Sequence, residues 1–122
     1  MPKITLIGAG SVVFTRNLTS DILLTPALQE STIALMDISA AALDPMSALA
    51  RRMAKQAGTG ATVEATTDLE EALRGADYVS VSIRVGESDN SVAIPLKYGI
   101  DQAIGDTTGP GGVFYFLRNA SA

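Results

Sequence analysis

Short hydrophobic runs alternate along this chain with longer segments in which hydrophobic residues recur at helical spacing. Residues 4–7 form a nearly continuous apolar run, which predicts a strand covered by helices on both faces of its sheet. In the segment that follows, Phe14, Leu18 and Ile22 recur at helical spacing, which predicts an amphipathic helix. Pro26 marks the expected end of this helix.

A second strand is expected over residues 32–38, and a second helix follows it. Ser39 or Asp44 could cap this helix; Asp44 is favoured because Pro45 would then occupy the first helical position, where its missing N–H costs no hydrogen bond. The helix is expected to close at Gly58 and Gly60. The residues expected to face the core are Met46, Leu49, Ala50 and Met53.

The same alternation continues through the middle of the chain. A third strand is expected over residues 61–66. Asp68 is followed three residues later by Glu71, which is the pattern of a capped helix start, and Gly75 marks where this short helix stops. Residues 78–83 form the fourth expected strand.

Strands that alternate with helices of this length build right-handed βαβ units around a parallel sheet. The expected fold class is therefore α/β, a Rossmann-like, doubly wound parallel sheet that is truncated to about four strands in the order 3-2-1-4, with helices on both faces. A chain of 122 residues is long enough for one core. Residues 1–122 are expected to form a single, incomplete dinucleotide-binding domain.

A glycine-rich turn lies between the first expected strand and the first expected helix. Gly8 and Gly10 lack a Cβ, so the backbone can turn sharply there and a pyrophosphate can approach the N-terminus of the helix. Val13 stands where the usual fingerprint has a third glycine, so the match is incomplete.

An acidic residue, Asp37, lies at the end of the second expected strand. A carboxylate at this place can accept both ribose hydroxyls of an adenosine and repel a 2′-phosphate, which favours NAD over NADP. Two other interpretations stay open. Gly8 and Gly10 could form only a tight turn while Asp37 caps the next helix, and the same arrangement would also suit a different nucleotide or S-adenosylmethionine.

Composition narrows the classes of function. The chain has no Cys and no His, so it has no disulfide framework, no thiolate or imidazole ligand for a metal, and no histidine to act as a general base. A net charge of -4 argues against a nucleic-acid-binding surface. No apolar run approaches the roughly 20 residues of a membrane span. We therefore expect a soluble, cytoplasmic protein with no nucleic-acid or membrane partner.

Several segments together resemble one family of enzymes. These segments are 7–15, 21–23, 34–38, 72–79, 84–86, 94–99 and 105–112. They resemble the N-terminal region of the family 4 glycoside hydrolases, which are NAD- and metal-dependent α-glucosidases, α-galactosidases and 6-phospho-glycosidases. The similarity extends from about residue 3 to residue 118, nearly the whole chain.

The resemblance implies a fold like that of lactate or malate dehydrogenase, and an oxidation and elimination mechanism in place of the usual two-carboxylate displacement. NAD would take hydride from C3 of the sugar and a base would take the C2 proton; the aglycone leaves, water adds, and the C3 ketone is reduced again. It further implies Mn or another divalent metal in the full-length enzyme, and a glycoside or 6-phospho-glycoside as substrate.

The resemblance also assigns roles in cofactor binding. The family's dinucleotide turn corresponds to Gly8, Gly10, Ser11 and Val12, with the backbone amides of Ser11 and Val12 facing the phosphates. Asp37 corresponds to the acid that binds the ribose.

Two later segments are candidates for the cofactor and the substrate. Ile83, Arg84 and Val85 leave the fourth expected strand near the point where nicotinamide and sugar would meet. Arg84 could contact a substrate phosphate or be a surface arginine. Asp106 and Thr107 stand where the family more often has a Gln-Glu pair and are further substrate candidates, although the Gly-Pro-Gly-Gly sequence after Gly-Asp-Thr-Thr could simply start the next helix.

The family's Cys and His metal ligands and its catalytic base have no counterpart in this chain. No catalytic or metal-binding residue is therefore predicted, and the chain is expected to be the cofactor-binding part of such an enzyme, inactive alone and without the catalytic and substrate domain. The alternative is a non-catalytic nucleotide-binding or interaction module. Without a fifth strand, residues 78–83 would form an uncovered apolar edge, so a homo-oligomer is expected.

Overall fold

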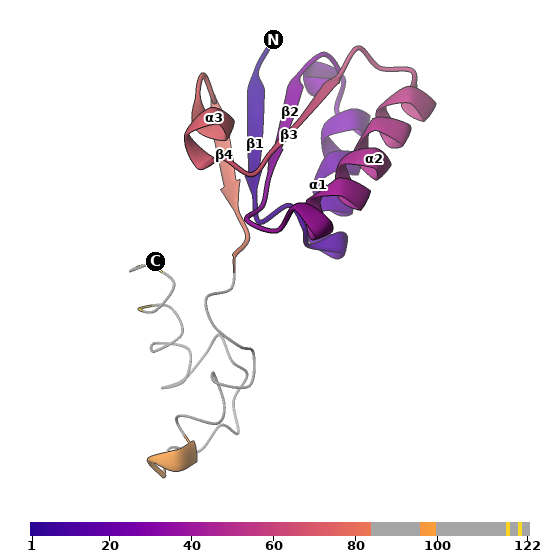
Figure 1. The fold of residues 1–122 in the computed structure, drawn as a ribbon. Coiled ribbons are helices and arrows are strands. Elements are labelled where there is room, and N and C mark those ends of the chain that lie inside the picture. The colour runs from indigo at the N-terminus through magenta and orange to yellow at the C-terminus, as the bar shows by residue number, and fades with distance from the viewer. Residues whose placement is uncertain (84–95, 100–116, 118–119, 121–122) are drawn as a thin grey trace. The chain divides into compact units, whose positions relative to one another are not determined.

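The computed structural model describes residues 1–83, 96–99, 117 and 120 (Figure 1). The chain divides into two compact units, Met1–Ser82 and Ile83–Ala122. The sheet and the helices that cover it lie in the first unit. In the second unit, the amide of Gly99 donates a hydrogen bond of 3.0 Å to the carbonyl of Leu96 and closes a turn.

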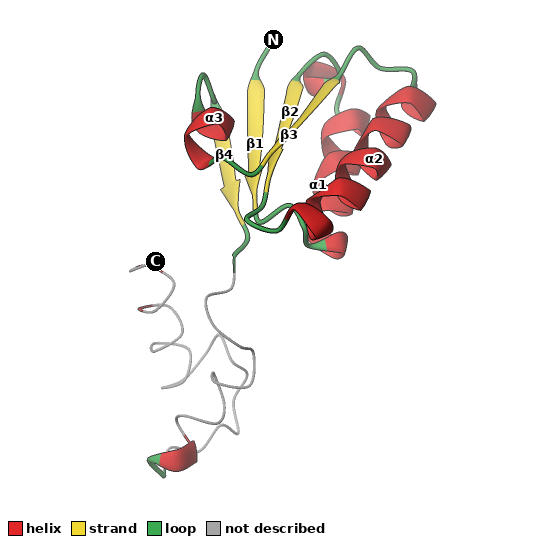
Figure 2. Ribbon diagram, viewed as in Figure 1, coloured by secondary structure: helices red, strands yellow, loops and turns green. Residues whose placement is uncertain are grey.

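The first unit is built on a parallel sheet. Its strands are β1 (Lys3–Ile7), β2 (Thr32–Met36), β3 (Thr62–Thr66) and β4 (Tyr78–Val81). They lie in the order β3-β2-β1-β4 (Figure 2), which confirms the predicted topology. In the register of this sheet Ile4 is the partner of both Ile33 and Tyr78. The carboxyl ends of all four strands therefore lie at one edge of the sheet, as parallel pairing requires.

Two long helices, α1 (Val12–Leu24) and α2 (Ala40–Ala57), cover one face of the sheet (Figure 1). Every second residue of a strand faces these helices, which pack on the apolar side chains at those positions. The buried residues of this core are Ile4, Leu6, Ala9, Ile22, Leu23, Ile33, Leu35, Leu43, Ala50 and Ala54. A short 3-10 helix, η1 (Pro26–Leu28), follows α1.

A short helix, α3 (Leu69–Leu73), covers part of the opposite face. Thr5 lies between Ile4 and Leu6 on β1, so its side chain points away from the core of α1 and α2. Its hydroxyl is fully buried and donates a hydrogen bond of 2.9 Å to the carbonyl of Ala72 in α3. The predicted helices on both faces of the sheet are therefore present.

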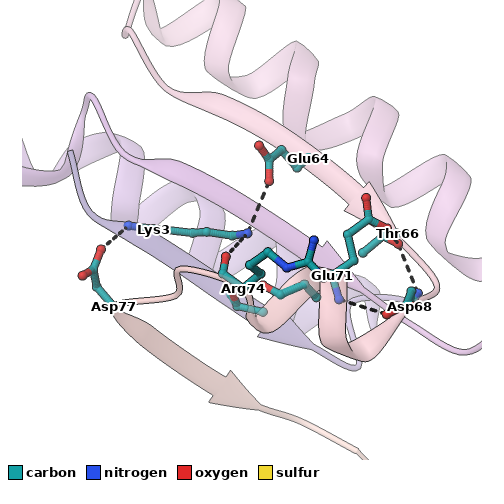
Figure 3. A network of polar contacts seen from close by, with 9 residues as sticks. Lys3, Glu64, Thr66, Asp68, Glu71, Arg74 and Asp77 are labelled. Carbon is teal, nitrogen blue, oxygen red and sulfur yellow. Dashed lines mark hydrogen bonds and ion pairs between the residues drawn. The ribbon is translucent and has the colours of Figure 1, made fainter.

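A polar network fixes α3 and the start of β4 against β1 (Figure 3). The amide of Lys3 donates to the Asp77 carboxylate at 2.8 Å, and the Asp77 amide donates back to the Lys3 carbonyl at 2.9 Å. The Lys3 ammonium donates to the carbonyl of Arg74 at 2.8 Å and lies 3.6 Å from a carboxylate oxygen of Glu64. These contacts hold the amino-terminal ends of β1 and β4 in register.

The cap predicted for α3 is also present. Asp68 accepts a hydrogen bond of 2.9 Å from the amide of Glu71, as its spacing predicts. The Glu71 carboxylate, however, turns to the hydroxyl of Thr66, which donates to it at 2.6 Å. The same Thr66 oxygen accepts the amide of Asp68 at 3.1 Å, so the cap extends back to the end of β3.

Three sequence predictions differ from the structure in their details. The cap of α2 is Ser39, whose hydroxyl accepts the amide of Ala42 at 3.3 Å, and Pro45 lies inside the helix and not at its first position. The second strand ends at Met36, before Asp37 and Ile38, and the fourth ends at Val81. Asp37 and Ile38 therefore lie beyond the end of β2, and Ser82 and Ile83 lie beyond the end of β4.

The third difference lies on α1, whose buried side is rotated from the predicted stripe. Phe14 is 58% exposed, whereas Thr15 and Thr19 are buried beside Ile22. Thr15 can be buried there because its hydroxyl donates to the carbonyl of Ala9 at 2.8 Å. On α2, Met46 and Ala50 are buried as predicted.

In the described part of the chain, each helix is too short or too polar to form a membrane span.

Candidate functional site

The glycine turn, residues 8–11, joins the end of β1 to the start of α1 and is bound to the end of β2. Gly8 has a φ of 85°, a left-handed conformation that glycine adopts without strain. The amides of Gly8 and Ala9 both donate to the carbonyl of Met36 at 2.9 Å. The predicted sharp turn is therefore present, and it lies at the carboxyl edge of the sheet, where open α/β sheets bind ligands.

The amino end of α1 directly follows this turn. The Ser11 amide donates to the carbonyl of Gly8 at 3.2 Å, and the Ser11 side chain makes no capping hydrogen bond. The first hydrogen bond of the helix runs from Thr15 to the Ser11 carbonyl at 3.1 Å. The amides of Val12 and Val13 precede that bond and carry the positive end of the helix dipole, which suits an anion. The Ser11 amide, which is predicted to face a phosphate, is already bonded to the Gly8 carbonyl. A phosphate would have to compete with that carbonyl for it.

Asp37 lies immediately after β2 and is bound to the same turn. Its Oδ2 accepts a hydrogen bond of 2.8 Å from the amide of Gly10, and its Oδ1 accepts one of 2.9 Å from the amide of Ser39. The side chain is half-buried. The structure therefore brings together the two features, glycine turn and acidic residue, that the sequence placed 27 residues apart.

Gly10 allows this close approach because it has no side chain. A Cβ at this position would lie 2.7 Å from Oδ2 of Asp37 and 2.8 Å from the Cβ of Ala42 in α2. Both separations are well inside van der Waals contact. By contrast, Val13, at the place of the missing third glycine, is 57% exposed, so a side chain fits there without crowding the sheet.

A hollow lies on the other side of the glycine turn, between α1 and β4. Gly8, Phe14 and Leu18 line it from the turn and α1, and Ser80 and Ser82 line it from β4 and the residue after it. The Ser82 amide donates to the carbonyl of Ile7 at 2.9 Å, which keeps the chain beside β1 after β4 ends. The hollow and Asp37 thus flank the amino end of α1.

The remaining candidate residues lie at or beyond the end of this unit. Ile83 is 42% exposed, two residues after β4. Arg84, Val85, Asp106 and Thr107 lie outside the described residues. Their predicted roles stay predictions.

Sequence reasoning missed two contributors to the site. The sequence indicates Ser39 only as a helix cap, yet its amide also binds Asp37. An aspartate two residues before the donor is the signature of an Asx turn. Ala42, whose Cβ limits the space beside Gly10, carries no signal of its own in the sequence. Only the packing of α2 against the turn reveals its role.

The site does not fit a metal ion. Within the described part of the chain, no three Asp or Glu side chains gather closely enough to hold one, and the sequence contains no Cys or His. We therefore assign no metal ligand here.

Comparison with known proteins agrees with the sequence and the fold. The sequence pattern of the family described as Family 4 glycosyl hydrolase matches residues 3–121. An alpha-galactosidase from Rhizobium meliloti is 42% identical over 120 residues, which are 96% of this chain and 24% of the relative. An alpha-glucosidase from Erwinia rhapontici is also 42% identical over 120 residues, 95% of this chain and 26% of the relative.

Solved structures show the same similarity. The 6-phospho-beta glucosidase from Thermotoga maritima, determined with manganese, NAD+ and glucose-6-phosphate, superimposes with a TM-score of 0.79 at 28% identity, covering 98% of this chain and 29% of that one. A lactate dehydrogenase from Cryptosporidium parvum shares the fold, with a TM-score of 0.56 at 19% identity over 70% of this chain and 25% of that one. The chain spans about a quarter of the length of the curated relatives named above. The family match over nearly all of its residues shows that this chain belongs to the family 4 glycosyl hydrolases.

Proposed function

We propose that this chain is the NAD-binding region of a family 4 glycosyl hydrolase, with residues 1–122 belonging to one Rossmann domain. The observation that carries the proposal is the placement of Asp37 beside the glycine turn, with Gly10 and Ser39 each donating to one of its oxygens. A carboxylate offers about four acceptor sites. Two are used by these amides, which leaves two for the pair of hydroxyls on an adenosine ribose.

The proposed position of NAD follows the carboxyl edge of the sheet. The ribose would bind Asp37, and the pyrophosphate would lie at the start of α1 on the amides of Val12 and Val13. The nicotinamide would extend toward the hollow lined by Ser80 and Ser82, near Ile83. When bound, NAD supplies a group that accepts hydride and returns it; the part described here binds and orients it.

We further propose that the whole protein acts on a glycoside or 6-phospho-glycoside. Support comes from its relatives, among which are alpha-galactosidases, an alpha-glucosidase and 6-phospho-glucosidases. Arg84, Asp106 and Thr107 are the residues of this chain proposed to approach that substrate. Two of the similar solved structures contain manganese, but we assign no ligand for a divalent metal among the residues of this chain.

A cytoplasmic location and a homo-oligomer complete the proposal. NAD is available inside cells, which supports the location. The oligomer is supported by β4, an edge strand of the described sheet on which Tyr78 is 63% exposed and Val81 is 60% exposed. Within the described sheet no further strand pairs with the outer side of β4. An edge strand with apolar side chains can pair with a second copy.

Titration of NAD into the ¹⁵N-labelled chain tests the binding site. We expect the amide resonances of residues 8–14 and of Ser39 to shift together as NAD is added, because the proposed pyrophosphate and ribose positions lie beside them. The amides of β3 (Thr62–Thr66), at the far edge of the sheet, serve as the internal control. No shift, or shifts confined to β3, would contradict the proposed site.

A further inference from the structure

Asp37 is held from two sides by backbone amides. Gly10 donates from the turn after β1, and Ser39 donates from the residue that caps α2. We propose that Asp37 is also a positioning residue, which sets the shape of the glycine turn before a nucleotide arrives; this proposal rests on the NAD-binding function proposed above. We call the carboxylate and its two amide donors the Asp37 clamp.

Hydrogen-bond geometry supports a firm clamp. The two distances, 2.8 and 2.9 Å, fall in the range of charge-assisted hydrogen bonds, which are about twice as strong as neutral ones. The carboxylate is also confined by packing. A Cβ built on Gly10 would lie 2.7 Å from Oδ2 of Asp37 and 2.8 Å from the Cβ of Ala42, so the turn and α2 meet with no room for a side chain.

The clamp connects the turn to the binding of phosphate. Gly10 directly precedes Ser11, the cap of α1, so the position of Gly10 sets the direction of the first amides of that helix. Holding these amides before the ligand binds removes part of the ordering cost of binding. Because the carboxylate is fixed, it also cannot turn aside to admit a 2′-phosphate.

A role through the ribose alone makes a different prediction. If Asp37 acted only by accepting ribose hydroxyls, its substitution would not affect a ligand that lacks them. Removing its negative charge would even favour a diphosphate nearby, because like charges repel. The clamp predicts the opposite change in affinity. Substitution of Asp37 would release the turn, and the diphosphate would then bind more weakly.

The test compares ADP with 2′,3′-dideoxyadenosine diphosphate on the wild-type chain and on the Asp37→Asn variant. Asparagine keeps the size of the side chain but presents an NH₂ group to one of the two amides, so one hydrogen bond is lost. We expect the variant to bind the dideoxy ligand about tenfold more weakly and ADP more weakly still. Unchanged or tighter binding of the dideoxy ligand by Asp37→Asn would overturn the proposal.

Asp21→Asn is the matched control. Asp21 is an exposed acid on α1 whose carboxylate has no partner among the residues that the structure describes. This variant removes the same charge and should leave the affinity for both ligands unchanged. An equal loss in Asp21→Asn would show that the weaker binding does not depend on the Asp37 hydrogen bonds, and would also overturn the clamp.

A second measurement needs no variant and no ligand. In the ¹³C,¹⁵N-labelled wild-type chain, scalar coupling across the hydrogen bonds should connect the nitrogens of Gly10 and Ser39 to the Cγ of Asp37 without nucleotide. Absence of both couplings would overturn the clamp even if NAD binds. Couplings present in a chain that binds neither NAD nor ADP would support the clamp and contradict the proposed NAD-binding function.

Discussion

The amide of Gly10 donates a hydrogen bond of 2.8 Å to Oδ2 of Asp37, which joins two segments that are 27 residues apart in the chain. The turn after β1 and the end of β2 are therefore one structural unit. The Met36 carbonyl strengthens this unit, since it accepts the amides of both Gly8 and Ala9. A change at any one of these residues should affect both the folding of the sheet edge and the binding of a nucleotide there.

Substitution of Gly10 by alanine should destabilise this unit. Its Cβ would lie 2.8 Å from the Cβ of Ala42, and α2 would have to shift to make room. We expect the free energy of unfolding to fall by about 1–3 kcal/mol, as in other overpacked positions, and NAD binding to weaken. Chemical denaturation measures the first effect and calorimetric titration the second.

Gly60→Ala is the control for this substitution. The nearest atom to a Cβ at Gly60 is Cγ of Glu30 at 3.5 Å, an ordinary contact. The free energy of unfolding of the Gly60→Ala variant should be unchanged or up to about 1 kcal/mol higher, because alanine restricts the unfolded chain. Equal stability of the two variants would show that Gly10 is not needed for packing.

Ser39→Ala separates the two residues proposed as caps of α2. Ser39 accepts the Ala42 amide at 3.3 Å, so its loss should lower the free energy of unfolding by about 1 kcal/mol. Asp44→Ala, within the helix, should change it by less than about 0.5 kcal/mol. Thermal denaturation of both variants is the measurement. A larger loss in Asp44→Ala would favour the cap first expected from the sequence.

The buried hydroxyl of Thr5 should matter for the position of α3. Thr5→Val keeps the shape of the side chain but leaves the Ala72 carbonyl without its donor at 2.9 Å. We expect a loss of about 1–3 kcal/mol in the free energy of unfolding. Thr62→Val, on the exposed edge strand β3, makes the same chemical change and should have an effect below about 0.5 kcal/mol. If the two variants unfolded alike, the contact between β1 and α3 would contribute nothing to stability.

The exposed edge of β4 predicts self-association. Analytical ultracentrifugation of the chain should show a mass that rises with concentration. Val81→Lys places a charge beside this edge and should shift the chain toward monomer. Thr62→Lys on β3, at the other edge, should leave the association as it was. A monomer at every concentration in the unmodified chain would contradict the proposed homo-oligomer.

The sequence alone predicted the fold well because its signals are local. Hydrophobic runs and helical periodicity placed the strands and helices. The alternation of strands and helices indicated a parallel sheet, and the Rossmann pattern supplied the strand order 3-2-1-4, which the structure confirms. Ser39 was one of two predicted caps, but Pro45 favoured the later start at Asp44; in the structure Ser39 is the cap and Pro45 is accommodated inside α2. Such a choice depends on the end of β2, which periodicity locates only within a few residues.

The sequence predicted the individual residues of the candidate site but not the hydrogen bonds and packing contacts that join them. Gly8, Gly10 and Asp37 stood out by their places after strands. That Asp37 already binds two amides depends on how closely α2 approaches the turn, and this is set by the small side chain of Ala42. Contacts between segments that are distant in sequence leave no local pattern, so they required the structure.

The measurement that tests the central claim most directly is calorimetric titration of the purified chain with NAD and then with NADP. We predict micromolar or tighter binding of NAD and binding of NADP that is weaker by about tenfold or more, because a 2′-phosphate removes a donor to Asp37 and adds a like charge beside it. No heat with either nucleotide, or equal affinity for both, would contradict the account of this chain as an NAD-binding region.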